Sequence, residues 1–310
     1  MIWSVDAIYY SPTGTSEKIA ESVAESLAKA LAASLTGSDK ESKDGFSGAV
    51  GNTDLTMAAK PLEFENTFAV IAAPVYGGRI APTAIGRLRQ IKAKDSLCAV
   101  VAVYGNRDYE DALLELMDEA RSCGFVPVAA GAFIGEHSYS TEEYPIAQDR
   151  PDSNDLKKCR EFGNGLAAHY AELLPAVEQM EGMCWQMMEL PAVKGNYPYK
   201  EYNPSPATPQ TDTTRCVLCG RCIDMCPVSC IEMKSHQSGQ VEADESAVAE
   251  DVIVSDPQIC TKCCACVKGC PFGARIYNTP YSEKLHKSCN ERKEPEWYFG
   301  RVGSSWKEKC

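Results

Sequence analysis

Two short stretches of the sequence share one cysteine pattern: CVLCGRCIDMCP at residues 216–227 and CTKCCACVKGCP at residues 260–271. Each has the spacing C-x2-C-x2-C-x3-C-P, which is typical of proteins that bind [4Fe-4S] clusters. The spacing has a physical reason, because three thiolates two residues apart wrap a tight loop around one cubane while the fourth begins a helix that leads away. Two complete copies therefore predict two clusters.

The repeats resemble those of the bacterial two-cluster ferredoxins, in which the fourth cysteine of each repeat ligates the cluster of the other repeat. The resemblance implies a small α+β domain and two ligand sets. Cluster I is expected to use Cys216, Cys219, Cys222 and Cys270, and cluster II to use Cys260, Cys263, Cys266 and Cys226.

A pair of zinc knuckles is the alternative, but zinc sites take their ligands as two pairs and usually recruit histidine, which neither repeat contains. Cys230 and Cys264 lie beside the predicted ligands but outside the pattern. We expect both to be packing residues, with ligand exchange as the alternative. The other cysteines are expected to be structural: Cys98, Cys123, Cys159, Cys184, Cys289 and Cys310.

Residues 1–178 alternate apolar, strand-like runs with amphipathic helical patterns, which favours βαβ units and a parallel sheet. The expected strands lie at residues 2–10, 54–57, 67–73, 97–104 and 126–133. Between them, apolar residues recur at helical spacing. The pattern predicts a compact, doubly wound α/β domain.

A loop rich in hydroxyl groups, Ser11-Pro-Thr13-Gly14-Thr15-Ser16, follows the first strand and directly precedes the first helix. Hydroxyl groups and free backbone N–H groups at a helix N-terminus form an anion site without a lysine. The loop is neither a Walker A loop nor a GxGxxG turn. A simple helix cap is the alternative interpretation.

Two further loops end the third and fourth strands, where ligands bind at the switch point of a doubly wound sheet. They read Pro74-Val75-Tyr76-Gly77-Gly78-Arg79 and Tyr104-Gly105-Asn106-Arg107-Asp108-Tyr109. Each offers an aromatic ring for stacking and glycines that let backbone amides approach a planar heterocycle. With these loops the domain resembles a flavodoxin, whose phosphate-loop pattern Ser/Thr-x-Thr-Gly-x-Thr/Ser it matches.

The whole chain resembles the flavodoxin-ferredoxin fusion proteins of anaerobic bacteria and archaea, including Glu136-His137-Ser138-Tyr139-Ser140 and the turn Arg150-Pro151-Asp152. The resemblance implies FMN, two [4Fe-4S] clusters and a five-stranded parallel sheet of order 2-1-3-4-5. Tyr76 and Tyr109 fall where flavodoxins place rings beside the flavin. A flavodoxin-like shell without flavin is the alternative. The implied FMN contacts are Ser11, Thr13, Gly14, Thr15, Ser16, Pro74, Val75, Tyr76, Gly77, Gly78, Tyr104, Gly105, Asn106, Arg107 and Tyr109.

We expect a flavodoxin-like FMN-binding domain at residues 1–180, a linker rich in proline and aromatic residues at 181–211, and a ferredoxin domain with a C-terminal extension at 212–310. Such a linker is extended and semi-rigid. It is expected to pack along a domain surface, with a loose tether as the alternative. The stretch 233–252 is interpreted as a surface insertion, either a tolerated loop or a partner-docking hairpin.

Two kinds of side chain near the expected flavin raise questions of mechanism. Typical flavodoxins surround the flavin with acidic groups, whereas here Arg79 and Arg107 lie in the flavin loops. Positive charge stabilises reduced, anionic flavin, so we expect a less negative potential, unless these arginines face solvent or pair with Asp108 or Glu110. His137 is a candidate proton donor or a loop hydrogen-bonding residue. No other catalytic residue is assigned.

The composition excludes several partner classes. A net charge of -12 argues against non-specific binding of nucleic acid or of an anionic membrane surface. No apolar run approaches the roughly 18 residues of a transmembrane helix, and the N-terminal apolar run lacks the features of a signal peptide. We therefore expect a cytoplasmic protein whose thiolates serve as metal ligands.

These features together predict an electron-transfer protein that passes single electrons between the clusters and FMN. We expect it to link a low-potential donor, such as a ferredoxin or another low-potential oxidoreductase, to a flavin-level acceptor in anaerobic metabolism, because such clusters often lie near roughly -400 mV. The alternatives are a flavoenzyme that reduces a small organic substrate at FMN, and a binding module with an empty flavin site. Enzymatic activity, a small-molecule acceptor and a homodimer are left open.

Overall fold

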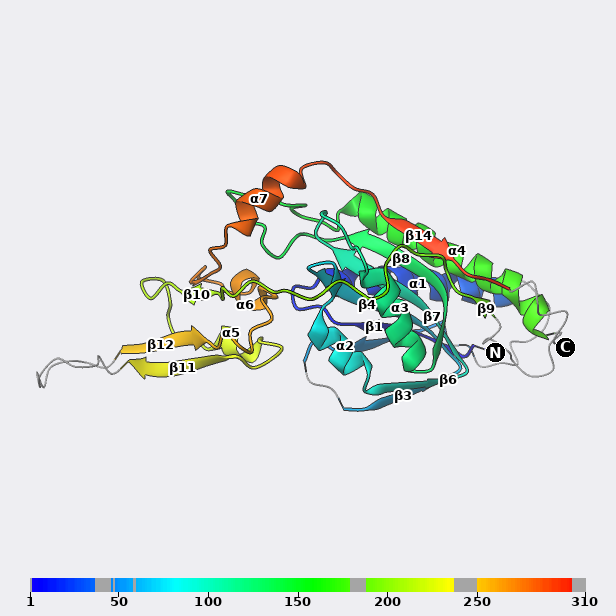
Figure 1. Cartoon of the computed structure of the whole chain (residues 1–310). Helices are drawn as coiled ribbons and strands as arrows, with labels where there is room; N and C mark the ends of the chain where they lie inside the picture. Colours follow the sequence, from blue (N-terminus) through cyan, green and yellow to red (C-terminus); the bar gives the residue numbers. More distant parts are fainter. Residues whose placement is uncertain are drawn as a thin grey trace, which may run out of the picture.

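The computed structural model describes residues 2–36, 46, 48–57, 60–178, 188–236 and 250–302. A sheet domain with helices on both faces adjoins a smaller domain of short helices and two-stranded ribbons (Figure 1). In the described part of the chain, no helix combines the length and apolarity needed to cross a membrane.

Five parallel strands form the centre of the main sheet. In spatial order they are β2 (Val50–Asp54), β1 (Ser4–Tyr9), β4 (Thr67–Tyr76), β7 (Ser96–Tyr104) and β8 (Phe125–Ile134). Numbered along the chain among themselves, they run in the predicted order 2-1-3-4-5. The second strand precedes the expected segment, because this edge strand is polar and the apolar signal came from the buried Leu55 just after it.

Helices cover both faces of this sheet, which explains why its central strands are apolar throughout. On one face, α1 (Thr15–Thr36) and α4 (Ser153–Glu178) share a core with side chains of β1, β4 and β7. On the other face, α2 (Pro82–Leu88) and α3 (Ala112–Ser122) build a second core. Short strands β3 (Leu62–Glu65) and β6 (Ile91–Lys94) pair beside it, and β5 (Arg79–Ile80) pairs with the end of β4.

The C-terminal segment does not belong to the second domain, contrary to the boundary expected at 212–310. Strand β14 (Glu296–Phe299) pairs antiparallel with β8 and so extends the main sheet. Trp297 stacks on Phe133, with ring centroids 6.2 Å apart, and also contacts Phe162. Burial of these rings on the α4 side of the sheet holds the segment there. Beyond it, β15 (Arg301–Val302) pairs with β9 (Met188–Glu189) at the other end of the linker.

The second domain is therefore inserted between two segments that both run along the first. It contains α5 (Arg221–Asp224) and α6 (Ala265–Lys268), the ribbon of β10 (Gln210–Thr211) with β13 (Arg275–Ile276), and the hairpin of β11 (Ile231–His236) with β12 (Glu250–Ser255). The described part of the expected insertion forms this hairpin, and residues 237–249 lie outside the described residues. Helix α7 (Tyr281–Ser288) leads back towards the sheet domain.

The described part of the linker packs along the first domain, as expected of a surface-bound segment. The backbone N–H groups of Asn196 and Lys200 donate to the carboxylate of Asp111, over 2.9 and 2.7 Å. The hydroxyls of Tyr197 and Tyr199 both donate to Asp118. Acidic groups at the start and along the side of α3 thus hold the linker, which fixes where the second domain begins. Cys184 lies outside the described residues, as does Cys310.

Candidate functional site

One cavity of about 580 Å³ opens at the carboxyl ends of the parallel strands. This volume lies within the range of small-molecule and cofactor sites. Both domains and the linker contribute to its wall, which includes the loops after β1, β4, β7 and β8, linker residues 200–205, residues Thr261 and Lys262 of the second cysteine repeat, and one side of α7. The cavity therefore lies where the two domains meet.

The hydroxyl-rich loop forms one end of this cavity. Ser11, Thr13, Thr15 and Ser16 line it, and the buried Oγ of Ser16 has no hydrogen-bond partner. A buried hydroxyl is rarely left unpaired, so this atom fits an anionic oxygen of a ligand. Gly14, at φ +80°, adopts the left-handed conformation that glycine accepts without strain. Ser11 Oγ accepts a hydrogen bond from Glu17 N over 3.0 Å, so the loop also serves as a helix cap.

The two expected ring loops meet the cavity only in part. Pro74, Val75, Tyr76 and Gly77 line it, as do Tyr104, Gly105 and Arg107. The structure does not bring Tyr109, Asn106 or Gly78 to the cavity, nor the small Gly14. Tyr109 is only 1% exposed and packs edge-on against Tyr104, with ring centroids 5.5 Å apart. Its ring serves the core under the loop rather than the cavity.

Asn106 instead holds the C-terminal segment. Its side-chain amide donates to the carbonyl oxygens of Cys289 and Glu291 over 2.7 and 2.8 Å, and its Oδ1 accepts from Lys293 N over 3.1 Å. The loop after β7 is thereby fastened to the segment that returns from the second domain. The sequence offered no local signal for this role, because the partners are more than 180 residues away.

The two arginines of the ring loops have different surroundings. Arg79 forms an ion pair with Glu115, with 2.8 Å between Nε and Oε2, and lies over the ring of Tyr199 at 4.8 Å. It therefore supports the linker and does not line the cavity. Arg107 lines the cavity and pairs with Glu110 at 2.5 Å. Of these two arginines, Arg107 is the candidate for a positive charge beside a bound flavin.

His137 lines the cavity and packs so closely on Gly105 that a Cβ there would lie 2.3 Å from the imidazole ring. Its Nδ1 accepts a hydrogen bond from Tyr139 N over 3.0 Å, which places the proton of the neutral ring on Nε2. Burial, aided by the positive charges of Arg107 and Lys268, lowers the pKa of His137 to about 4. At neutral pH the ring is uncharged, so His137 is better suited to donate a hydrogen bond than to deliver a proton.

Two smaller cavities lie inside the second domain, and each is surrounded by one of the predicted sets of four cysteines. Cys216, Cys219, Cys222 and Cys270 line the first. The second is lined by Cys226, Cys260, Cys263 and Cys266, which Cys230 and Cys264 join. The fold thus exchanges the fourth cysteine between the repeats, as the resemblance implied. Ligation of iron by these residues remains a prediction.

The surroundings shift the pKa values of these thiols in both directions. Burial raises the pKa of Cys222, Cys263 and Cys266, whereas hydrogen bonds favour the thiolate, the form that binds metal, at other ligands. A hydrogen bond from Cys230 lowers the pKa of Cys226 to about 6, and the same thiol does so for Cys260. Backbone N–H groups add further donors, since Ala274 N lies 3.3 Å from Cys270 Sγ. None of the described cysteines forms a disulfide. The donor set therefore fits an anionic iron-sulfur cluster.

The second cysteine repeat connects the cluster II cavity with the large cavity. Thr261 and Lys262 line the large cavity, while Cys260 and Cys263 on either side of them line the cluster II cavity. The cluster I side faces solvent, where Cys219 is exposed and Val217 is 57% exposed. The two cysteine sites are thus arranged in series from the protein surface to the large cavity.

The two domains are joined by direct polar contacts near this junction. Lys268 of α6 donates to Glu136 Oε1 over 2.6 Å and to the carbonyl of Ser140 over 2.9 Å. Tyr139 packs edge-on against Tyr277, with centroids 5.2 Å apart. The segment 136–140, on which the family resemblance partly rests, therefore forms part of the domain interface as well as of the cavity wall.

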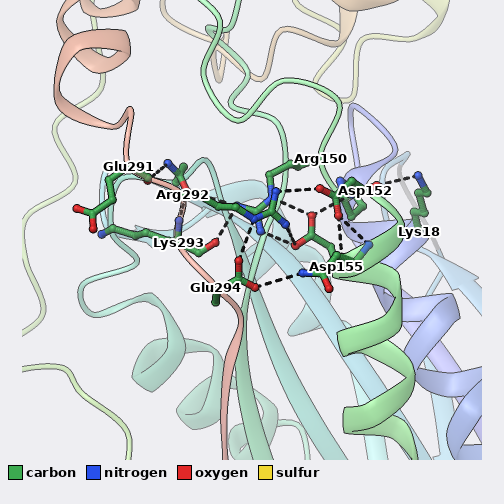
Figure 2. A network of polar contacts seen from close by, with 11 residues as sticks. Lys18, Arg150, Asp152, Asp155, Glu291, Arg292, Lys293 and Glu294 are labelled. Carbon is green, nitrogen blue, oxygen red and sulfur yellow. Dashed lines mark hydrogen bonds and ion pairs between the residues drawn. The ribbon is translucent and has the colours of Figure 1, made fainter.

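A buried ion pair anchors the returning C-terminal segment. Figure 2 shows Arg150 pointing at Asp155. Both side chains are at most 5% exposed. Arg292 pairs with Asp152 at 2.9 Å. Arg150 also donates to the carbonyl of Lys293 over 2.9 Å. The turn after the fifth parallel strand is thus tied to the start of α4 and to the C-terminal segment at once.

Comparisons with known proteins match both halves of the chain. Residues 215–274 match the model of the 4Fe-4S dicluster domain. Ferredoxin-3 of Nostoc sp. is 30% identical over 71 residues, which are 22% of this chain and 73% of that protein. A flavodoxin from the domain Archaea is 12% identical with a TM-score of 0.31, and the match covers 53% of this chain and 96% of that one.

A similar match covers 55% of this chain and 37% of the rubredoxin oxygen:oxidoreductase of the anaerobe Desulfovibrio gigas, at 16% identity and a TM-score of 0.36. The strand order that defines the first domain comes from the hydrogen bonds of this chain itself.

Proposed function

This chain belongs to the two-cluster ferredoxins through residues 215–274, here fused to a flavodoxin-like domain, and we propose that it passes single electrons between two [4Fe-4S] clusters and FMN. The observation that carries the proposal is the second cysteine repeat, because one loop lines both the cluster II cavity and the large cavity. Such an arrangement keeps the path between a cluster and a ligand of the large cavity inside the protein.

Several features of the large cavity support FMN as its ligand. The loop at residues 11–16 offers hydroxyl groups, one of them buried and unpaired, to a phosphate. Tyr76 and Tyr104 offer rings to a planar heterocycle, and Gly77, at φ +63°, has open space in front of its Cα. When bound, FMN supplies a centre that exchanges electrons one or two at a time, whereas each cluster exchanges one.

The chain's own residues would orient and shield this ligand. His137 keeps its Nε2 proton available as a hydrogen-bond donor at the cavity wall. Linker residues 200–205 and one side of α7 form part of the cavity wall and would cover part of a bound ligand. The exposed cluster I side would then receive electrons from a low-potential protein donor, and cluster II would hand them to the flavin-level acceptor.

A second candidate function is a flavoenzyme that reduces a small organic substrate at FMN. It is favoured by one observation: the cavity wall includes the rings of Tyr76 and Tyr104 and the imidazole of His137, which could contact a substrate beside the flavin.

Reduction of FMN through the clusters tests the leading proposal. The holoprotein, reconstituted anaerobically, is mixed with a reduced ferredoxin donor, and the flavin absorbance is followed by stopped flow. The variant Cys263→Ala, which removes a predicted cluster II ligand, should slow flavin reduction at least tenfold. Cys98→Ala, at a buried cysteine inside β7, is the matched control and should leave the rate unchanged. An unchanged rate in Cys263→Ala would exclude the internal route.

A further inference from the structure

The two cysteine repeats can be compared position by position, because they share one spacing. The first continues as Cys226-Pro227-Val228-Ser229-Cys230, and the second as Cys270-Pro271-Phe272-Gly273-Ala274. In the first, Cys230 N donates a hydrogen bond to Cys226 Sγ, and in the second, Ala274 N donates to Cys270 Sγ. Both distances are 3.3 Å. The backbone is thus the same at the two positions, and the side chains are a thiol in one case and a methyl group in the other.

The thiol of Cys230 does not merely fill space. It is 5% exposed, and its sulfur lies 3.5 Å from that of Cys226. Cys226 is a predicted ligand of cluster II. Ala274 occupies the equivalent place beside cluster I, so the fold itself does not require a sulfur there.

The direction of the hydrogen bond between Cys230 and Cys226 follows from the chemistry of the ligand. A cysteine that binds iron does so as the thiolate and has no proton to donate. With Cys226 in that state, Cys230 is the member of the pair with an S–H group. Its thiol must therefore be the donor and the Cys226 sulfur the acceptor.

We propose that Cys230 is a positioning residue that tunes cluster II: its thiol donates to the sulfur of the ligand Cys226 and raises the reduction potential of cluster II. The inference rests on the proposed function. Hydrogen bonds to the sulfurs of a cluster stabilise the additional negative charge of the reduced form and so raise its potential. A higher potential at cluster II would favour electron flow from cluster I towards the large cavity, and such a transfer would need no proton or co-reactant.

The second extra cysteine of this site has another role. Cys264 stands where the first repeat has Gly220, and both have positive φ, of 62° and 75°. Its Sγ contacts the carbonyl of Lys262 at 3.5 Å. That thiol is directed to the backbone of its own loop and is not assigned a role in tuning, whereas Arg275 Nη2, 4.0 Å from Cys266 Sγ, is a further donor to a ligand of cluster II.

Reciprocal substitutions test the inference. Cys230→Ala gives cluster II the side chain found at cluster I, and Ala274→Cys does the reverse. The two cluster potentials are measured by anaerobic redox titration with EPR detection. Cys230→Ala should lower the potential of cluster II only, and Ala274→Cys should raise that of cluster I only. We expect up to about a tenfold change in the distribution of the electron between the clusters, which for a one-electron couple is about 59 mV.

Cys230→Ser, which keeps a hydrogen-bond donor, should shift the potential less than Cys230→Ala. Unchanged potentials in Cys230→Ala, with both clusters assembled, would overturn the inference. If that variant fails to assemble cluster II, the variant Ala274→Cys tests the inference instead. An unchanged potential of cluster I in Ala274→Cys would then overturn it. Failure of the proposed function looks different, because the unsubstituted protein would then show no pair of EPR-active clusters.

Discussion

Arg87 of α2 donates a hydrogen bond to the carbonyl oxygen of Pro227, the residue that directly follows the predicted ligand Cys226. The same guanidinium donates to the carbonyls of Leu55 and Thr56 and lies over the ring of Tyr10 at 5.7 Å. One side chain of the first domain thus fixes the position of a cluster-bearing loop of the second.

Replacing this side chain should loosen the junction between the domains. We expect Arg87→Ala to slow the reduction of FMN by the clusters several-fold while the cofactor potentials stay the same, and to cost about 1–3 kcal/mol of unfolding free energy through unpaired buried carbonyls. Stopped-flow absorbance and urea unfolding measure the two effects. Arg89→Ala, which removes an exposed pair with Glu119, is the control and should do neither. Equal rates in the two variants would contradict the prediction.

The flavin potential should respond to Arg107 but not to Arg79. Only Arg107 lines the cavity, whereas Arg79 is engaged by Glu115. Because a nearby positive charge favours the anionic reduced flavin, Arg107→Gln should lower the FMN midpoint potential. The shift should be modest, since Glu110 partly neutralises this charge. Potentiometric titration of both variants decides, and an equal shift in Arg79→Gln would show that the charge does not act locally.

Asp155 should matter far more for stability than its neighbour Asp152. Asp155→Asn leaves the buried Arg150 without its counter-charge and should cost about 3–5 kcal/mol. The side chain of Asp152 is 36% exposed and pairs with the similarly accessible Arg292, so Asp152→Asn should cost less than about 1 kcal/mol. Denaturant unfolding of the two variants gives the comparison. Similar losses would mean that the pair in Figure 2 is not buried in solution.

His137 should remain uncharged over the whole physiological range. Its pKa is lowered from 6.5 to about 4, because burial and neighbouring cations disfavour the imidazolium. A depressed histidine pKa contributes stability that is present above pH 6.5 and is lost as the pH falls towards 4. NMR titration of carbon-13-labelled histidine, with His137→Gln to assign the signal, should show no inflection of this residue between pH 6 and 8. Titration near 6.5 would restore the proton-donor hypothesis.

Local pattern was sufficient for some features. The alternation of apolar runs and helical patterns predicted the central strands, since strands such as β7 are buried along their whole length. The spacing of Cys216, Cys219 and Cys222 predicted one side of a cluster cavity. The phosphate-type loop was also visible, because its function depends on a helix N-terminus that begins within the same few residues.

Other features depend on partners far away in the chain, and no local pattern reveals them. Asn106 and Tyr109 occupy a loop of the expected type, yet one holds residues 289–293 and the other lies in the core. The pairing of β14 with β8 could not be predicted either, because a four-residue strand is a weak signal and its rings become buried only against α4.

The sequence by itself therefore determined the types of element, the two cysteine repeats and the loop at residues 11–16, because each is set by neighbours within a few residues. Only the tertiary structure decided that Thr261 and Lys262 line the same cavity as Ser16 and Tyr76, and that each repeat contributes its fourth cysteine to the cavity of the other. The physical reason is that the chain leaves the first domain through the linker and returns to it through the C-terminal segment. The linker and the C-terminal segment both bind the first domain, and this double attachment sets where the second domain meets the cavity.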